Sequence, residues 1–448
     1  MSPPAMAPEE VLRALARQGL DGAEVFLKHG RSRRLELTVG GEAAVWSEER
    51  AWAVRAGNRR GSFFAAGTGE PPPEGPWPPP LGPLLVLPEA SAGAPWSEPG
   101  DFDAPLIGES EGFGLLRTIG RELAVELPGA RLLHAALEDG WSEGDLASSR
   151  GVRARRRQRV ASLHVEASGP ARPARIGNAP AAASLYLAAR EARRFQAKAL
   201  ARHLADRLSV NASTTFPDEL ADRPLEVLLA PPAAARLLAG LLPLLVGPRA
   251  ASRGAALRDP RGRLASDLLT VIDDGRLAGG VFESPLDGEG VPSREVVLVE
   301  DGIFRQPLLA WWQADGAGAA AGETSGCSRR ASWRDLPSPG PTHLYVQPDP
   351  RISVASLLGA VGRGAYLIDA TGGALVDLEG DRFALPVCGF TVRAGRAGAP
   401  IASAWLRGGV GDLLRGIAGV GRDLTFHPLD GMIGSPTLLV TGLTLARD

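Results

Sequence analysis

Hydrophobic positions at the start of the chain repeat first with a helical period and then with the period of a strand. Val11, Leu12 and Leu15 share one face between Glu9 and Gln18, which predicts a short amphipathic helix. Apolar residues then alternate with polar ones, at Leu35, Leu37 and Val39 and again at Trp52 and Val54. Glycines at 40–41 and a polar stretch at 58–61 separate these runs, so an antiparallel meander is expected.

The next 140 or so residues mix both periods. A helix is expected over Gly112–Leu127, where leucine and isoleucine recur at helical spacing before Pro128. Strands are expected over Ala130–Leu137 and 152–167, with a turn at Asp139-Gly140. An Ala-, Leu- and Arg-rich stretch from Ala181 to Leu208 is typical of a long helix.

The polar, proline-bearing segment 212–224 predicts a boundary between an N-terminal domain, residues 1–211, and a C-terminal domain, residues 212–448. A proline-rich linker, residues 70–105, lies inside the first domain. Beyond the boundary the pattern favours strands and turns, with helices expected only at Ala233–Leu245 and Ser353–Val361. The predicted fold class is therefore α+β: an N-terminal antiparallel sheet with helices, followed by a largely antiparallel β domain with few helices.

Composition excludes several classes of protein. The 448 residues carry a net charge of −2, so no basic field for nucleic acid or anionic membrane is present, and nucleic acid is an unlikely partner. Two cysteines cannot form a disulfide scaffold. The most apolar stretch, 227–247, contains three prolines and Arg236, which favours a buried strand and helix over a membrane span. With no signal-like N-terminus, we expect a cytoplasmic protein without a membrane partner.

Three patterns could carry chemistry but have simpler explanations. The six histidines include no pair three to five residues apart, so no metal-binding helix is predicted. Gly108–Gly112 fits the GxSxG pattern around Ser110, but its lead-in is short and broken by Pro105, which favours an ordinary helix N-terminus. Five arginines between 153 and 159 could bind phosphates, yet no aromatic residue is interleaved with them, so a solvated strand face is favoured.

The segment from Asp273 to Pro292 is acidic and rich in glycine. Its glycines permit positive φ angles and close approach of another backbone, and its carboxylates can accept hydrogen bonds. The candidate site is a peptide-facing or partner-facing cleft formed by five residues of this segment: Asp287, Gly288, Glu289, Gly290 and Pro292. A solvated loop is the alternative.

The same segment, read on to Leu309, resembles the TldD/PmbA family. Further similarities follow the family's order along nearly the whole chain: Ala23-Glu24-Val25, Ser47-Glu48-Glu49-Arg50, Ser148-Ser149-Arg150-Gly151, Gly302 with Leu308-Leu309, Val420–Leu424 and Gly434–Leu438. TldD-like members of the family are metallopeptidases with an HExxxH helix and a later cysteine ligand. TldE-like members, also called PmbA, lack these ligands and pair with a TldD subunit.

The resemblance implies the TldE-like branch, because the HExxxH positions fall near Ala239, Gly240 and Leu244 and no cysteine lies between Gly421 and Thr437. A partial echo of a family motif stands at Thr324-Ser325-Gly326. The expected function is that of a metal-free subunit in a heteromeric protease complex that hydrolyses unfolded or modified peptides. No catalytic residue or cofactor is expected in this chain, and zinc is expected only in the TldD-like partner. Two alternatives stay open: a stand-alone peptide- or nucleic-acid-binding protein, and a serine hydrolase acting through Ser110.

Overall fold

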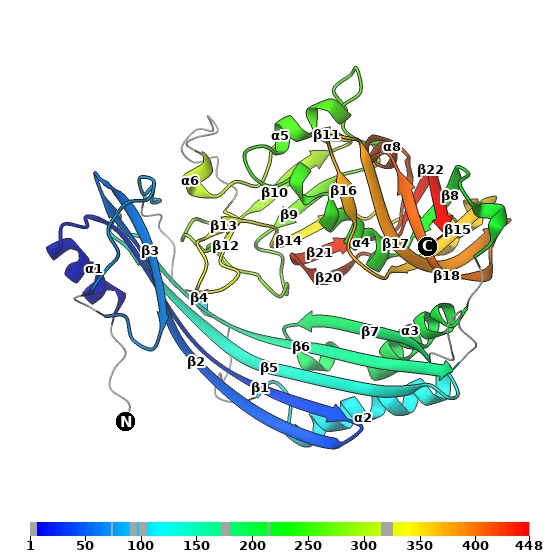
Figure 1. Ribbon diagram of the computed structural model, residues 1–448, viewed down its shortest axis with the longest axis horizontal. Coiled ribbons are helices and arrows are strands. Elements are labelled where there is room, and N and C mark those ends of the chain that lie inside the picture. Colours follow the sequence, from blue (N-terminus) through cyan, green and yellow to red (C-terminus); the bar gives the residue numbers. More distant parts are fainter. Residues whose placement is uncertain are drawn as a thin grey trace.

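The computed structural model describes residues 7–72, 75–89, 96–97, 105–171, 180–213, 216–314 and 326–447. A long curved sheet with three helices forms the N-terminal part, and two further sheets with short helices form the C-terminal part (Figure 1). The α+β prediction is confirmed. Residues 73–74, 90–95 and 98–104 of the proline-rich linker and the first two residues of Thr324-Ser325-Gly326 lie outside the described residues, and the division at 211/212 stays a prediction.

The N-terminal sheet has the strand order β3-β2-β1-β5-β6-β4, and β7 also pairs with β6. All its pairings are antiparallel except that of β4 with β6. Its strands are β1 (Gly22–Thr38), β2 (Gly41–Asn58), β3 (Gly61–Thr68), β4 (Trp96–Ser97), β5 (Arg131–Ser148), β6 (Arg153–Ala171) and β7 (Pro180–Ala189). The meander and its turns after Thr38 and Asn58 are as predicted.

Two predictions in this part are wrong. Asp139-Gly140 is no turn but the middle of β5, because buried Asp139 is held by Arg33 of β1, whose Nε donates to Oδ1 at 3.0 Å. The chain turns instead at 149–151, where Gly151 has φ +85°. The segment 181–208 is not one helix, since its first residues alternate between the two faces of β7 and pair with β6.

Helices α1 (Pro8–Arg17), α2 (Glu109–Glu126) and α3 (Ala197–Asn211) cover the N-terminal sheet. Leucines of the sheet and of α2 and α3 form one buried cluster, with members such as Leu35, Leu137 and Leu163 on the strands and Leu116 and Leu204 on the helices. In a strand, neighbouring side chains point to opposite faces. The residues between these leucines therefore project from the other face of the sheet.

The C-terminal part contains a six-stranded sheet of order β11-β10-β9-β14-β21-β20 and a seven-stranded sheet of order β15-β8-β22-β18-β17-β16, in which β19 also pairs with β22. Parallel pairing occurs only between β14 and β21 and between β15 and β8 among the named strands of these sheets. The strands are β8 (Leu225–Leu229), β9 (Val271–Asp274), β10 (Glu295–Glu300), β11 (Ile303–Phe304), β14 (His343–Val346), β15 (Arg363–Ala370), β16 (Leu375–Asp377), β17 (Arg382–Arg393), β18 (Arg396–Gly408), β19 (Ile417–Val420), β20 (Thr425–Leu429), β21 (Gly431–Ser435) and β22 (Leu438–Arg447), while β12 (Ser328–Arg329) and β13 (Ser338–Pro339) pair separately.

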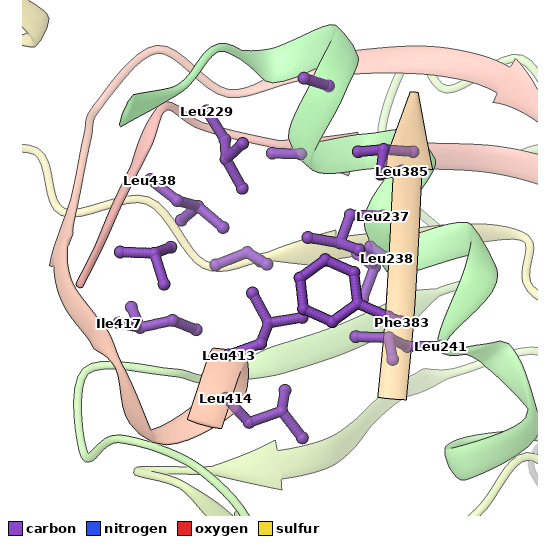
Figure 2. Close-up of a cluster of buried hydrophobic side chains, with 14 of the residues drawn as sticks. Leu229, Leu237, Leu238, Leu241, Phe383, Leu385, Leu413, Leu414, Ile417 and Leu438 are labelled. Atoms are coloured by element: carbon purple, nitrogen blue, oxygen red, sulfur yellow. The ribbon is translucent and has the colours of Figure 1, made fainter. Parts of the chain in front are cut away.

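Five short helices accompany these sheets: α4 (Pro231–Gly240), α5 (Ala250–Arg253), α6 (Trp311–Ala314), α7 (Val354–Ala360) and α8 (Val410–Arg415). Helix α4 packs into a core that takes side chains from both sheets, and Figure 2 shows Leu237, Leu238 and Leu241 beside Phe383 and Leu385. The expected strand and helix over 227–247 are thus β8 and α4. No helix among the described residues is long and apolar enough to cross a membrane.

Candidate functional site

The segment between β9 and β10 forms a tightly bonded turn around Asp287. Its Oδ1 accepts hydrogen bonds from the backbone N–H groups of Glu289 and Val291, both at 2.9 Å, and its Oδ2 accepts one from Ser328 N at 3.0 Å. Burial, reinforced by the negative charge of Glu289, raises the pKa of Asp287 to about 7. The turn is therefore a built element of the fold and not a solvated loop.

Glu289 joins this turn to the N-terminal sheet. Its side chain is fully buried and accepts hydrogen bonds from Arg55 Nη2 at 3.2 Å, Trp311 N at 3.0 Å and Ser328 Oγ at 2.5 Å. The carboxylate thus holds β2, where Arg55 lies, against two segments of the C-terminal part.

Four charged side chains make up this buried contact, which we call the buried ion cluster: Glu24, Arg55, Glu289 and Arg330. Arg55 donates to Glu24 at 2.9 and 2.5 Å, and Arg330 also donates to Glu24. Burial by itself would raise the pKa of Glu24, but the charges of Arg55 and Arg330 outweigh it and lower that pKa. Burial likewise disfavours the charged form of Arg55, but the attraction of the Glu24 carboxylate outweighs this effect of burial, so the pKa of Arg55 is raised. Two anions balance two cations.

The glycines of the turn lie where other parts of the chain approach. Gly290 has φ +80°, and a Cβ there would lie 2.4 Å from Val152 Cγ1 of the N-terminal part. A Cβ on Gly288 would lie 2.9 Å from the Ser328 carbonyl oxygen. The predicted close approach of a backbone is therefore present at Gly288, but the approaching backbone belongs to this same chain. Pro292 is exposed and forms a β-bridge with Leu286.

A pocket of about 290 Å3 lies between the N-terminal sheet and the C-terminal part. Strands β1, β5 and β6 line one side, and Asp287 and Gly288 line the other with residues around Ser328. The lining mixes aromatic and charged side chains: Phe26, Phe282 and Trp333, the cations Lys28, Arg155, Arg156, Arg329 and Arg330, and the anions Glu143 and Asp287. Its volume is near the lower end for small-ligand sites, and aromatic walls with a few charges suit a peptide segment.

The arginine run lies on β6 beside this pocket and is largely paired with acidic groups. Arg153 contacts Glu9 at 2.8 Å, and Arg155 and Arg157 both contact Glu143, at 2.7 and 3.5 Å. An aromatic partner that the sequence did not suggest comes from β5, where the Trp141 ring lies 4.7 Å from the Arg157 guanidinium. Acidic partners reduce the positive charge that this strand could offer to a phosphate backbone.

Ser110 lies exposed in the first turn of α2. Residues 105–108, directly before that helix, form no strand, whereas a nucleophile elbow needs a buried strand leading into the turn. The interpretation of this motif as a helix N-terminus therefore agrees with the structure.

The positions that align with HExxxH lie at the end of α4 and in the following turn (η3, Leu242–Leu244). Leu244 is buried, and a Cβ on Gly240 would lie 2.7 Å from Ala374 Cβ and 3.2 Å from Val376 Cγ2. Aliphatic side chains fill the space around this window, which Figure 2 shows from Leu237 to Leu241. His427 is a nearby imidazole on β20; its burial, followed by the charges of His203 and Arg236, lowers its pKa to about 4.

Comparison with known proteins identifies the family to which this chain belongs. Residues 222–447 match the model of the PmbA/TldA metallopeptidase C-terminal domain, which is half of the chain. The chain belongs to the PmbA/TldD family. It is 31% identical over 175 residues to a metalloprotease TldD homolog of Buchnera aphidicola from Schizaphis graminum, which is 38% of this chain and 35% of that protein. It is 25% identical over 213 residues to metalloprotease PmbA of Escherichia coli O157:H7, or 47% of this chain and 44% of that protein.

The alignments to these curated PmbA/TldD relatives thus span less than half of their length. Over nearly the full length, the fold is similar to that of TldE from Thermococcus kodakarensis, with a TM-score of 0.81, 17% identity, and coverage of 98% of this chain and 99% of that one. The predicted family is confirmed, and the likeness to TldE is a likeness of fold. The family region includes both the Asp287 turn and the α4 window.

Proposed function

We propose that this chain is a TldE-like subunit of a TldD/TldE-type metallopeptidase complex, which contributes peptide binding while its TldD-like partner supplies the hydrolytic metal. The observation that carries this proposal is the α4 window. Ala239, Gly240 and Leu244 offer no donor atom for a metal, and the space around them is occupied by aliphatic side chains. A hydrolytic zinc site needs three protein ligands and an open position for water.

The pocket between the two parts supports the peptide-binding role. Phe26 and Phe282 offer apolar contacts, and the charged groups around them can pair with peptide carboxylates and amines. The outer edge of β2 from Gly41 to Glu49 pairs with no described strand, because β3 pairs only from Ala51 onward and Gly69 N donates to the Arg50 carbonyl oxygen. An unfolded peptide can add to such an edge through backbone hydrogen bonds, which tolerate many sequences.

The alternative, a stand-alone nucleic-acid-binding protein, is less well supported. Its argument rested on the arginine run, and Glu9 and Glu143 pair with three of those arginines. The net charge of −2 also gives no attraction to a polyanion.

Complex formation and peptide binding test the proposal together. The chain is mixed with a TldD-like protein that bears the HExxxH motif, and the mixture is analysed by size-exclusion chromatography. Binding of a fluorescein-labelled unfolded casein is then measured by anisotropy. We expect a heteromeric complex, and we expect Phe26→Ala to weaken casein binding by roughly tenfold, the factor that corresponds to 1.4 kcal/mol.

Tyr186→Ala is the matched control, since Tyr186 is an exposed aromatic residue of the same sheet that neither lines the pocket nor lies on β2. Equal casein affinity in both variants would place peptide binding elsewhere. Absence of any complex with the TldD-like protein at micromolar concentrations would contradict the subunit role.

A further inference from the structure

Two histidines that are 30 residues apart in sequence meet on the N-terminal sheet. His134 lies on β5 and His164 on β6, and their ring centroids are 5.6 Å apart. Glu166 follows His164 by two residues and therefore shares its face, and it is directly opposite His134 in the strand register. The ligand atoms of these three side chains lie within 4.8 Å of one another. Among the described residues, these three side chains form a group of histidine and glutamate ligands that lie close enough together to share one metal ion.

These side chains are accessible to an ion. Ala135, Leu163 and Val165, their neighbours along the strands, are buried against α2 and α3, so the cluster projects from the opposite face of the sheet. The side chains of His134 and His164 are 20% and 36% exposed, and that of Glu166 is 48% exposed. An ion can enter without opening the fold.

We infer that His134, His164 and Glu166 form a binding site for a divalent transition-metal ion of the zinc class. Two imidazoles and one carboxylate are typical zinc donors, whereas calcium and magnesium prefer oxygen alone. His164 Nε2 and Glu166 Oε1 are 3.6 Å apart, which is too long for a good hydrogen bond. This distance between the two atoms is close to the separation of about 3.3 Å between two ligand atoms of a tetrahedral zinc ion whose bonds are about 2.0–2.1 Å long.

Glu36 of β1 is a positioning residue for this site. Its Oε1 lies 2.6 Å from His134 Nε2, and this hydrogen bond lowers the pKa of Glu36. A carboxylate that accepts from Nε2–H leaves the lone pair of the neutral imidazole on Nδ1, where a metal ion can bind.

This site is separate from the α4 window, and the inference does not depend on the proposed function. Metal bound here is removed by substitutions on β5 and β6, whereas metal bound near α4 is not affected by them. The test uses untagged, EDTA-treated full-length chain. Zinc is titrated against a chromophoric competitor at pH 7.5, and Co2+ is used in parallel because tetrahedral cobalt has a visible absorption band.

We expect one zinc ion per chain, and a loss of affinity of at least tenfold in His134→Ala and in His164→Ala. Glu36→Ala should lose about tenfold, as for other partners of metal-binding histidines. His29→Ala is the matched control, because His29 is an exposed histidine of the same sheet, on β1, and its Nε2 lies 3.0 Å from the Glu48 carboxylate.

Circular dichroism and thermal unfolding without metal check that each variant is folded. Absence of saturable zinc binding by the wild-type chain would overturn the inference. So would zinc binding that persists unchanged in the folded double variant His134→Ala/His164→Ala.

Discussion

Glu289 offers the sharpest test of how the two parts of the chain are held together. In the buried ion cluster its negative charge and that of Glu24 balance Arg55 and Arg330, and all four side chains are almost inaccessible to solvent. Glu289→Ala leaves one uncompensated positive charge there and also removes the acceptor for Trp311 N and Ser328 Oγ. Removing one partner from a buried ion pair typically costs about 3–5 kcal/mol.

Urea unfolding at pH 7.5, followed by tryptophan fluorescence, measures this loss. The matched control is Glu300→Ala, because Glu300 pairs with Arg305 at 2.8 Å on the surface of β10, with both side chains about half exposed. Exposed pairs contribute about 0–1 kcal/mol. We therefore expect the Glu289 variant to lose at least about 2 kcal/mol more than the Glu300 variant. Equal losses in the two variants would refute the view that the cluster joins the two parts.

Three further predictions concern single residues. The pKa of Asp287 is raised to about 7 from the ordinary 3.8, so its contribution to the free energy of unfolding is fully present below about pH 4 and is lost as the pH rises through about 7. Urea unfolding should therefore show that the wild-type chain is less stable at pH 8 than at pH 5, and that Asp287→Asn reduces this difference. A difference of the same size in both proteins would contradict the prediction. Gly290→Ala should cost about 1–3 kcal/mol more than Gly262→Ala, because both glycines have φ near +80° but only Gly290 meets a neighbour, and equal thermal shifts would rule this out. Ser110→Ala should leave casein hydrolysis by the reconstituted complex unchanged, and a loss of rate would revive the serine-hydrolase alternative.

Local periodicity predicted the elements whose signals agree with their final environment. The β1–β2 hairpin, α2 and α7 follow their apolar patterns, and Ser353, directly before α7, accepts a hydrogen bond from Ser356 N at 3.1 Å. The turn predicted at Asp139-Gly140 is absent. An Asp-Gly pair usually indicates a turn, whereas here Arg33 on a neighbouring strand neutralises the charge of Asp139 inside an extended strand. The alanines from 181 favour a helix by propensity, and pairing with β6 overrides that preference.

The candidate site was predictable in part. Asp287 and Glu289 stood out by their spacing with glycines, and the resemblance also marked Glu24, which meets the same cluster. Arg55 and Arg330 carried no local signal, because their role depends on contacts across more than 200 positions of sequence between the two parts. The His134, His164 and Glu166 group was missed since helical spacing was the criterion for a metal site. The alternation His-x-Glu on one strand was the only local hint.

The measurement that tests the central claim most directly is the hydrolysis of unfolded casein by three samples at equal zinc concentration: this chain alone, the TldD-like protein alone, and the mixture. The account predicts no hydrolysis by this chain alone, because its α4 window has no metal ligands. It predicts hydrolysis by the mixture that disappears when the HExxxH glutamate of the TldD-like protein is replaced by glutamine. Zinc-dependent hydrolysis by this chain alone would contradict the account.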